Sequence, residues 1–505
     1  MIGHNLTVRE ILRRSARRDP AKTAIAHYRD GAELTGVSYE TLFRDVNGLA
    51  QAMLEAGLRP GDRIAVLGEN SYEFCRLVLA AANAGMVAAP VNIQLGSDEL
   101  RSVLAELSPR AVAGDGPVLD RFAAALDDSA YGDRIWRFGS EPARGLAEPP
   151  DVPITADDPC LILYTSGSTG RSRGVVLTHG SVVMNSWNSV MCWGFRSSDR
   201  MLLGLPLYHV SMLNTTLVPT LQAGGTALIV NRLNAASLFR QLHATKATVT
   251  LALPFMYQAM LDEAANSELG YPPLRLALYG MAGMPNALSD RIRKELGAQM
   301  MSGFGQTESG GNTLVLTDAE HDGKCGSIGR PVANVEVELL DDQGNPLPPR
   351  SGAVGELAYR GASICLGYLT ERGTESAQQD SWLRSGDLAF EDGDGYFWFQ
   401  GRTRDVIKSG GENVYAAKVE QVISAIPGVV EVAVVGLSSE RWGEEVVAFV
   451  VGDPAVTAAE EIRALARRGL APYEVPKKVV FVESLPKSAA GKIVKRRLVE
   501  EYGNG

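Results

Sequence analysis

The segment Tyr164–Gly170 combines hydroxyl side chains with glycines and directly follows the apolar run Cys160–Leu163. The apolar run predicts a buried strand. Glycines let backbone amides close around an anion, and hydroxyls add hydrogen-bond donors without charge repulsion. The segment is therefore a candidate phosphate-binding loop, although clusters of Gly, Ser and Thr more often form plain surface loops.

The loop does not continue as a Walker A motif, because no Gly-Lys-Ser/Thr closes it. It continues instead through Arg171, Ser172, Arg173 and Gly174. Phosphate binding here would rely on backbone amides, hydroxyls and the guanidinium of Arg173.

Further segments carry residue types that suit the same chemistry. Phe304–Glu308 follows an apolar stretch and brings together an aromatic ring, a hydroxyl and a carboxylate, and Ser385–Leu388 is expected to set one carboxylate on a tight turn. Gly401–Val414 is a second glycine-rich element, and Pro486–Lys492 puts a lysine on a loop of small residues. Taken singly, each has a plain reading as a helix cap, a turn, a solvated cation or a tail lysine.

Composition narrows the class of protein. With 505 residues the chain should form two or more domains, and a net charge of −10 argues against a general nucleic-acid or anionic-membrane surface. Arginines interrupt the N-terminal segment, and no apolar run reaches membrane-spanning length, so we expect a cytoplasmic protein without a signal peptide. The five cysteines are scattered without CxxC spacing and read as reduced thiols: Cys75, Cys160, Cys192, Cys325 and Cys365.

Helical and strand patterns alternate along most of the chain. The apolar spacing from Leu42 to Met53 predicts a helix, and Ile64–Leu67 predicts a strand. Strand patterns recur at Thr226–Val230 and Thr248–Leu253 with a helical pattern between them. The fold class expected is α/β, a large N-terminal domain of mixed sheets covered by helices.

The pattern changes from about Gly395 to that of a small α+β domain. We place the boundary so that residues 1–402 form the N-terminal domain and residues 403–505 the C-terminal one. A capping box of Thr457 and Glu460 is expected to start a helix. The other elements predicted here are a strand at 395–399, a polar connector at 401–405, a helix at 416–425 and strands at 429–436 and 445–451.

Together, these motifs and their order closely resemble the superfamily of adenylate-forming enzymes. That superfamily holds acyl-CoA synthetases, nonribosomal-peptide adenylation domains and firefly luciferases. The resemblance runs from about Ile11 to Lys495 and rests on separate motifs in the right sequence. It implies an acid–thiol ligase that uses ATP, Mg²⁺ and coenzyme A, with a small mobile C-terminal domain that carries the catalytic lysine.

The resemblance also implies a role for each motif residue. Lys492, Thr307, Glu308 and His209 would be catalytic, with Glu308 also binding Mg²⁺. Phe304 would lie on adenine and Asp387 would accept the ribose hydroxyls. The full set expected at ATP or AMP is Thr165, Ser166, Gly167, Ser168, Thr169, Gly170, Arg173, Gly280, Met281, Ala282, Phe304, Gly305, Gln306, Asp387 and Arg402.

In the family the C-terminal domain rotates between acyl-adenylate formation and thioester formation. The resemblance places the pivot at Arg404. Rotation would withdraw Lys492 and bring Lys408, Gly410 and Gly411 to the channel for the pantetheine arm.

The expected acyl pocket is lined by His209, Val210, Ser211, Met212 and Met281. No acidic residue stands out there as a partner for an α-amino group. The pocket should therefore be apolar and suit a fatty, branched, alicyclic or aryl acid.

The loop departs from the family at one position, since relatives usually read Gly-x-Pro-Lys-Gly where this chain has Arg171-Ser172-Arg173-Gly174. Arg173 keeps the charge but replaces a compact ammonium by a planar fork. Several alternatives therefore stay open: thioester formation only, from acyl-AMP made elsewhere; loading of a separate carrier protein; light-emitting oxidation; or a non-catalytic nucleotide-binding protein. A homodimer is also left open, because no interface signal is seen.

Overall fold

The chain divides into two compact units in the computed structural model. It describes residues 6–503 apart from 30, 127–130, 132–133, 141–144, 167–171, 232 and 488–492, and the side chain of Ser166 is not described. The first unit comprises Met1–Val337 and Tyr359–Leu383, and the second comprises Glu338–Ala358 and Arg384–Gly505. Residues 384–402 thus group with the C-terminal part, while the proposed domain boundary at 402/403 and the pivot at Arg404 remain predictions.

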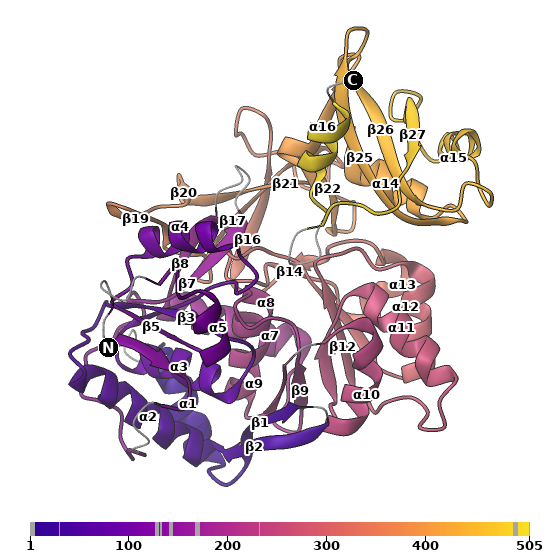
Figure 1. Ribbon diagram of the computed structural model, residues 1–505. Coiled ribbons are helices and arrows are strands. Elements are labelled where there is room, and N and C mark those ends of the chain that lie inside the picture. Colours follow the sequence, from indigo (N-terminus) through magenta and orange to yellow (C-terminus); the bar gives the residue numbers. More distant parts are fainter. Residues whose placement is uncertain are drawn as a thin grey trace. The chain divides into compact units, whose positions relative to one another are not determined.

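A seven-stranded sheet forms one half of the first unit (Figure 1). All neighbouring strands are parallel except β1 and β2. The strand order is β13 (Gln299–Gly303), β12 (Leu276–Gly280), β11 (Val249–Leu251), β9 (Arg200–Leu203), β10 (Thr226–Val230), β1 (Thr23–Arg29) and β2 (Ala32–Ser38).

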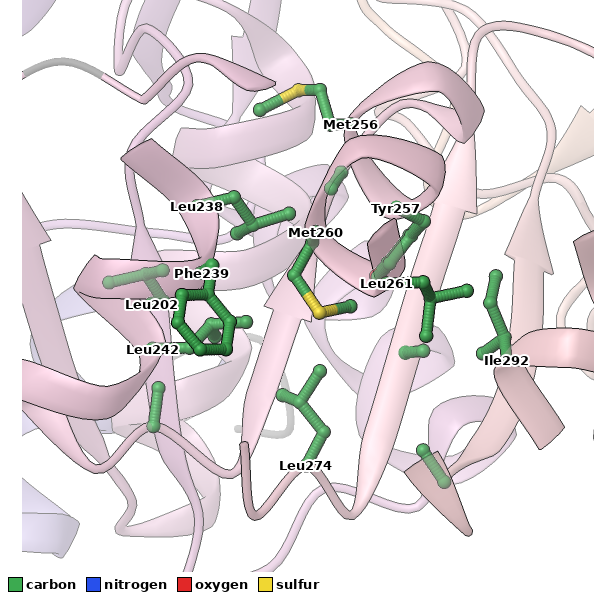
Figure 2. Close-up of a cluster of buried hydrophobic side chains, with 14 of the residues drawn as sticks. Leu202, Leu238, Phe239, Leu242, Met256, Tyr257, Met260, Leu261, Leu274 and Ile292 are labelled. Carbon is green, nitrogen blue, oxygen red and sulfur yellow. The ribbon is translucent and has the colours of Figure 1, made fainter. Parts of the chain in front are cut away.

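Three helices bury their apolar faces against this sheet. They are α10 (Ala235–Thr245), α11 (Pro254–Ala265) and α12 (Asn286–Leu296). Figure 2 shows Phe239 of α10, Met260 of α11 and Ile292 of α12 around the same cluster. The burial of these side chains fixes the ends of β12 and β13, where two of the predicted site segments begin.

An eight-stranded mixed sheet forms the other half of the first unit. Its order is β19 (Gly373–Glu375), β18 (Gly367–Thr370), β8 (Ser172–Thr178), β7 (Pro159–Ser166), β4 (Val87–Pro90), β3 (Arg63–Leu67), β5 (Ala111–Gly114) and β6 (Ile135–Arg137). The strands from β7 to β6 are parallel, and the pairs β7–β8, β8–β18 and β18–β19 are antiparallel. On one face, α4 (Ser97–Leu107) and α5 (Gly116–Arg121) pack on it.

Two helices contact both sheets. The helix α3 (Tyr72–Asn83) touches β1 of the first sheet and β3, β4 and β7 of the second. The helix α7 (His179–Trp193) touches β7 and β8, and its Trp193 Nε1 donates to Ser302 O of β13 at 2.9 Å. The first unit is therefore layered, with helices between two sheets and on their outer faces.

The second unit holds a five-stranded sheet in the order β24-β23-β26-β25, with β27 beside β26. Its strands are β23 (Val406–Ser409), β24 (Glu412–Tyr415), β25 (Val429–Ser439), β26 (Gly443–Gly452) and β27 (Lys478–Phe481). Apolar side chains of α14 (Ala416–Ser424) and α15 (Ala459–Ala466) cover one face, and Leu498 of α16 (Lys495–Tyr502) packs on the other. This is the α+β architecture that the sequence predicts.

Most predicted elements are confirmed, with three corrections. The capping box is wrong: α15 begins at Ala459, and Thr457 Oγ1 donates instead to Pro427 O at 2.6 Å. The strand expected at 395–399 is β22, which runs from Phe397 to Arg402 and so contains the start of the expected connector. The strand expected at 248–253 is shorter, because Leu253 caps α11. Among the described helices, none is both long and apolar enough to cross a membrane.

Candidate active site

The hydroxyl-rich loop connects two antiparallel neighbours, β7 and β8. In their ladder Thr165 pairs with Arg173 and Ser166 pairs with Ser172. The strand predicted before the loop is thus confirmed, and the loop is a hairpin connection between strands. Gly167, Ser168, Thr169 and Gly170 lie outside the described residues.

Glu308 is the carboxylate that the first unit brings to this hairpin. It is 9% exposed, and Tyr368 Oη donates to its Oε1 at 3.0 Å. Arg173 Nη2 lies 3.8 Å from the same Oε1, and the Arg173 guanidinium carbon lies 4.0 Å from the centre of the Tyr368 ring. Burial and then the charge of Glu308 raise the pKa of the Tyr368 hydroxyl, so Tyr368 remains a donor at neutral pH.

The backbone around Glu308 is fixed by close contacts that only glycine allows. A Cβ on Gly305 would come within 1.7 Å of Gly311 O. Phe304 N donates to Leu314 O at 2.9 Å, and Cys365 N donates to Glu308 O at 2.8 Å. The motif from Phe304 to Glu308 is therefore a tightly packed turn in which Thr307 is also nearly buried.

The second predicted adenine segment lies next to this turn. Gly280 pairs with Gly303 at the ends of β12 and β13, and a Cβ on Gly280 would come within 2.6 Å of Gly303 O. Met281 follows at φ +66°, a left-handed conformation that is uncommon for a side chain of this size, and is 44% exposed. Ala282 is also exposed. Gly280, Met281 and Ala282 thus lie beside the start of the Phe304 motif, as expected for one binding surface.

The predicted acyl segment begins at His209, which precedes the short helix α8 (Val210–Met212). Ser211 N donates to His209 Nδ1 at 3.3 Å, so Nδ1 is the acceptor and Nε2 carries the proton in the neutral ring. Ser211 is partly exposed, while Val210 and Met212 are buried.

A buried amide network links this segment to the turn after Glu308. A π-helix (Leu213–Leu217) follows α8, and Asn214 Nδ2 donates to Gly310 O at 2.5 Å. Asn185 of α7 donates to Asn214 O at 3.0 Å and accepts from Asn312 N at 3.0 Å. Neither asparagine was expected from the sequence, because their partners lie on segments far apart in the chain.

A cavity of about 430 Å³ in the first unit lies at the other end of β7, where Pro159, Gly61 and Val87 line it. Thr165 and Arg173 do not line it. It is therefore separate from the hydroxyl-rich hairpin.

In the second unit, Asp387 and Arg402 form a pair across β21 (Trp382–Glu391) and β22. Arg402 Nε lies 3.1 Å from Asp387 Oδ1, and Asp387 is 3% exposed. The tight turn expected at Ser385–Leu388 is wrong: these residues lie within β21, where Gly386 takes φ +72° and Ser385 Oγ accepts from Asp387 N at 3.0 Å.

The remaining predicted residues of this unit lie on a turn and a hairpin. Arg404 is in the 3₁₀ turn Thr403–Asp405 that follows β22. Lys408 ends near the hairpin of β23 and β24, whose connection Gly410-Gly411 has φ of +63° and +88°. Two consecutive positive φ values are what a two-residue hairpin of matching twist needs. Lys492 lies outside the described residues.

The structure thus brings Thr165, Arg173 and Glu308 together in the first unit and Asp387 and Arg402 together in the second. The residue that sequence analysis missed is Tyr368. No local signal marks it, because its contacts depend on β18 pairing with β8, where Tyr368 lies opposite Val175.

Comparison with known proteins identifies the family to which this arrangement belongs. Residues 12–369 match the AMP-binding enzyme family, and residues 418–492 match the AMP-binding enzyme C-terminal domain. The feruloyl-CoA synthase of an Amycolatopsis species is 37% identical over 492 residues, which are 97% of this chain and 98% of that one. The long-chain-fatty-acid–CoA ligase FadD13 of Mycobacterium tuberculosis is 35% identical over 478 residues, 92% of this chain and 93% of its own.

A solved structure, ATP-bound MatB from Rhodopseudomonas palustris, is 29% identical, covers 99% of both chains and superposes with a TM-score of 0.87. The architecture, the motif order and these relatives agree. The chain belongs to the AMP-binding, adenylate-forming enzymes, within the family of AMP-forming acid–CoA ligases.

Proposed function

We propose that the protein activates an apolar, aryl or fatty carboxylic acid with ATP to an acyl-AMP and then transfers the acyl group to the thiol of coenzyme A. The observation that carries this proposal is the group of Thr165, Arg173 and Glu308 at one hairpin. It sets hydroxyl, cationic and carboxylate side chains next to a glycine-rich loop. Such a group suits a nucleotide triphosphate and its counter-ion.

The donors and rings of the first unit would hold the nucleotide. Hydroxyls at Thr165, Ser166, Ser168 and Thr169 would donate to the β- and γ-phosphates. Arg173 would supply the positive charge that a lysine supplies in most relatives, and Thr307 would contact the α-phosphate. Phe304, beside Gly280, Met281 and Ala282, would cover the adenine.

Glu308 fits Mg²⁺, because a nearly buried carboxylate with a single close hydroxyl donor keeps oxygen lone pairs for a hard cation. When bound, Mg²⁺ would neutralise phosphate charge so that one anion can approach another. Arg173 would add to this neutralisation from the other side of the Tyr368 ring.

The second unit would act in turn on each half-reaction. Asp387 would accept both ribose hydroxyls, with Arg402 fixing its orientation. Lys492 would hold the substrate carboxylate against the α-phosphate during acyl-AMP formation. Rotation about Arg404 would then exchange Lys492 for the hairpin of Lys408, Gly410 and Gly411, which would line the path of the pantetheine arm.

The substrate class follows from the acyl segment. Residues 205–217 contain no acidic side chain, and Val210, Met212 and Met281 are apolar. His209 would face the carboxylate end of the substrate. Relatives named for feruloyl and long-chain fatty acyl substrates support an apolar or aryl acid and do not distinguish between them.

The proposal is tested by acid-dependent release of pyrophosphate. A panel should contain ferulate, indoleacetate, straight-chain fatty acids and a dicarboxylate as polar control, each with Mg-ATP and with or without coenzyme A. We expect release with an aryl or fatty acid and acyl-CoA when coenzyme A is present, identified by product mass. If no acid in the panel drives release, or if only the dicarboxylate does, the proposal is wrong.

The acceptor is tested in the same assay by replacing coenzyme A with a holo-carrier protein. Thioester on the carrier arm but none on coenzyme A would make the protein a carrier-loading ligase. Thioester from supplied acyl-AMP without any pyrophosphate release would show that Arg173 does not support activation.

A further inference from the structure

Tyr368 contacts both charged groups of the hairpin site with different parts of its side chain. Its hydroxyl donates to Glu308 Oε1 at 3.0 Å, and the face of its ring lies 4.0 Å from the guanidinium carbon of Arg173. It lies on β18, which pairs directly with β8, the strand that carries Arg173. The backbone of one sheet therefore sets the distance between Tyr368 and Arg173.

The two contacts differ in what they leave available. In the described part of the chain, the Tyr368 hydroxyl makes the single direct hydrogen bond to the Glu308 side chain. Arg173 Nη2, at 3.8 Å, is too distant for a hydrogen bond and acts on Glu308 through charge alone. Glu308 is thus oriented while keeping most of its lone pairs, and Arg173 is held by a ring face while keeping its N–H donors.

The arginine that departs from the family's usual lysine is the side chain that this contact needs. A guanidinium is planar and stacks on an aromatic face, whereas an ammonium is a compact, strongly hydrated charge. Because Arg173 is 44% exposed, a free side chain at this position would sample many rotamers. The Tyr368 ring limits that sampling.

We infer that Tyr368 is a positioning residue with two separable functions: its hydroxyl orients the carboxylate for the divalent cation, and its ring holds Arg173 for the phosphates. The inference rests on the proposed function, since it takes Glu308 and Arg173 as the cation-binding and phosphate-binding groups. It goes beyond that function by assigning a residue on a third segment of the chain. It also explains how an arginine serves in the loop.

Two substitutions separate the two functions. Tyr368→Phe removes the hydroxyl and keeps the ring, whereas Tyr368→Leu removes both. The measurements are binding of Mn²⁺, a paramagnetic substitute for Mg²⁺, in the presence of a non-hydrolysable ATP analogue, and binding of the analogue alone in EDTA. Neither readout requires turnover, so both report positioning directly.

For Tyr368→Phe we expect Mn²⁺ affinity to fall roughly tenfold, as for loss of one hydrogen bond to a charged group, with nucleotide affinity in EDTA changed by less than about twofold. For Tyr368→Leu we expect the same loss for Mn²⁺ and, in addition, a loss of about threefold or more in EDTA, because the ring face is also gone. Wild-type Mn²⁺ affinity in folded Tyr368→Phe would overturn the inference. Equal losses in both assays for Tyr368→Phe would also overturn it.

The matched control is Tyr271→Phe. Tyr271 Oη donates to Glu295 Oε2 at 2.9 Å in the same unit, on an exposed part of the surface. It removes the same kind of tyrosine–glutamate hydrogen bond, so it should leave both binding assays unchanged. If Tyr271→Phe lowers Mn²⁺ affinity as much as Tyr368→Phe, the effect is general and the inference fails.

Arg173→Lys tests the ring contact without disturbing the core. If Tyr368 acts through stacking, Arg173→Lys should weaken nucleotide binding in EDTA, and adding Tyr368→Leu should cause little further loss. Additive losses would show that the ring does not act through Arg173. If wild-type protein binds no nucleotide and releases no pyrophosphate with any acid, the proposed function itself is wrong; intact wild-type activity with unaffected Tyr368 variants would refute the inference alone.

Discussion

Arg402 and Asp387 are direct partners across β21 and β22, with Arg402 Nε 3.1 Å from Asp387 Oδ1. Asp387 is 3% exposed, so its charge is stabilised chiefly by contacts within the protein. A strand-to-strand pair of this kind holds the carboxylate in one orientation. A carboxylate held in this way can accept two hydroxyl donors at once, as the ribose of an adenylate requires.

Asp387→Ala should therefore weaken AMP binding at least about tenfold, since it removes an acceptor of charge-assisted hydrogen bonds. Isothermal calorimetry with AMP measures this directly. Arg496→Ala is the control, because it removes an exposed arginine that pairs with Glu500 in the same unit. An unchanged AMP affinity in folded Asp387→Ala would remove Asp387 from the site.

Lys492→Ala should abolish most activation while sparing thioester formation. Without the ammonium, the two anions that react lack a cation between them, and acid-dependent pyrophosphate release should fall by about 100-fold or more. Thioester formation from supplied acyl-AMP and coenzyme A should persist. Lys487 lies in the same segment and pairs with Glu431, so Lys487→Ala is the matched control; similar losses in both half-reactions for Lys492→Ala would refute its assigned role.

The elements that sequence analysis predicted best are those decided by local pattern. Apolar periodicity predicted α2 (Tyr39–Glu55) around Leu42–Met53, and β10 (Thr226–Val230) has the predicted bounds. Where a distant partner decides the outcome, local signals failed. Thr457 bonds the carbonyl of Pro427 rather than capping its own helix, and Ser385–Leu388 is a strand because β21 pairs with β22.

The same division holds for the candidate site. Arg173 and Glu308 could be proposed from motifs, because a glycine-rich loop or a carboxylate after an apolar run is visible locally. Tyr368 and Asn185 could not, since each acts through side chains or backbone groups on segments remote in sequence. Sheet pairing and helix packing bring those groups together, and no spacing rule within the chain encodes them.

Arg404→Pro should separate the two half-reactions in the opposite sense from Lys492→Ala. Proline fixes φ near −65° and restricts the residue before it, so a pivot in the turn Thr403–Asp405 would lose its freedom. We expect pyrophosphate release within about twofold of wild type and thioester formation lowered at least about tenfold. Arg404→Ala keeps the backbone free and should retain both; equal losses in both half-reactions for the proline variant would argue against a pivot at this residue.

The stability of the first unit should depend on the protonation of His179. This first residue of α7 is fully buried, Val8 N donates to its Nδ1 at 3.3 Å, and burial lowers its pKa from 6.5 to about 4. The unfolded chain therefore takes up a proton below about pH 6.5, whereas the folded chain does not do so until about pH 4. The stabilisation is fully present above pH 6.5 and is lost as the pH falls toward 4.

Between pH 7.5 and pH 5 this single group should lower the free energy of unfolding by about 2 kcal/mol. His179→Asn preserves an acceptor for Val8 N but does not titrate, so it should be less stable at pH 7.5 and lose less stability on acidification. Urea unfolding at the two pH values measures the difference. His243→Asn, at a partly exposed histidine on α10, should keep the wild-type pH dependence. A wild-type slope in His179→Asn would show that His179 does not account for the acid sensitivity.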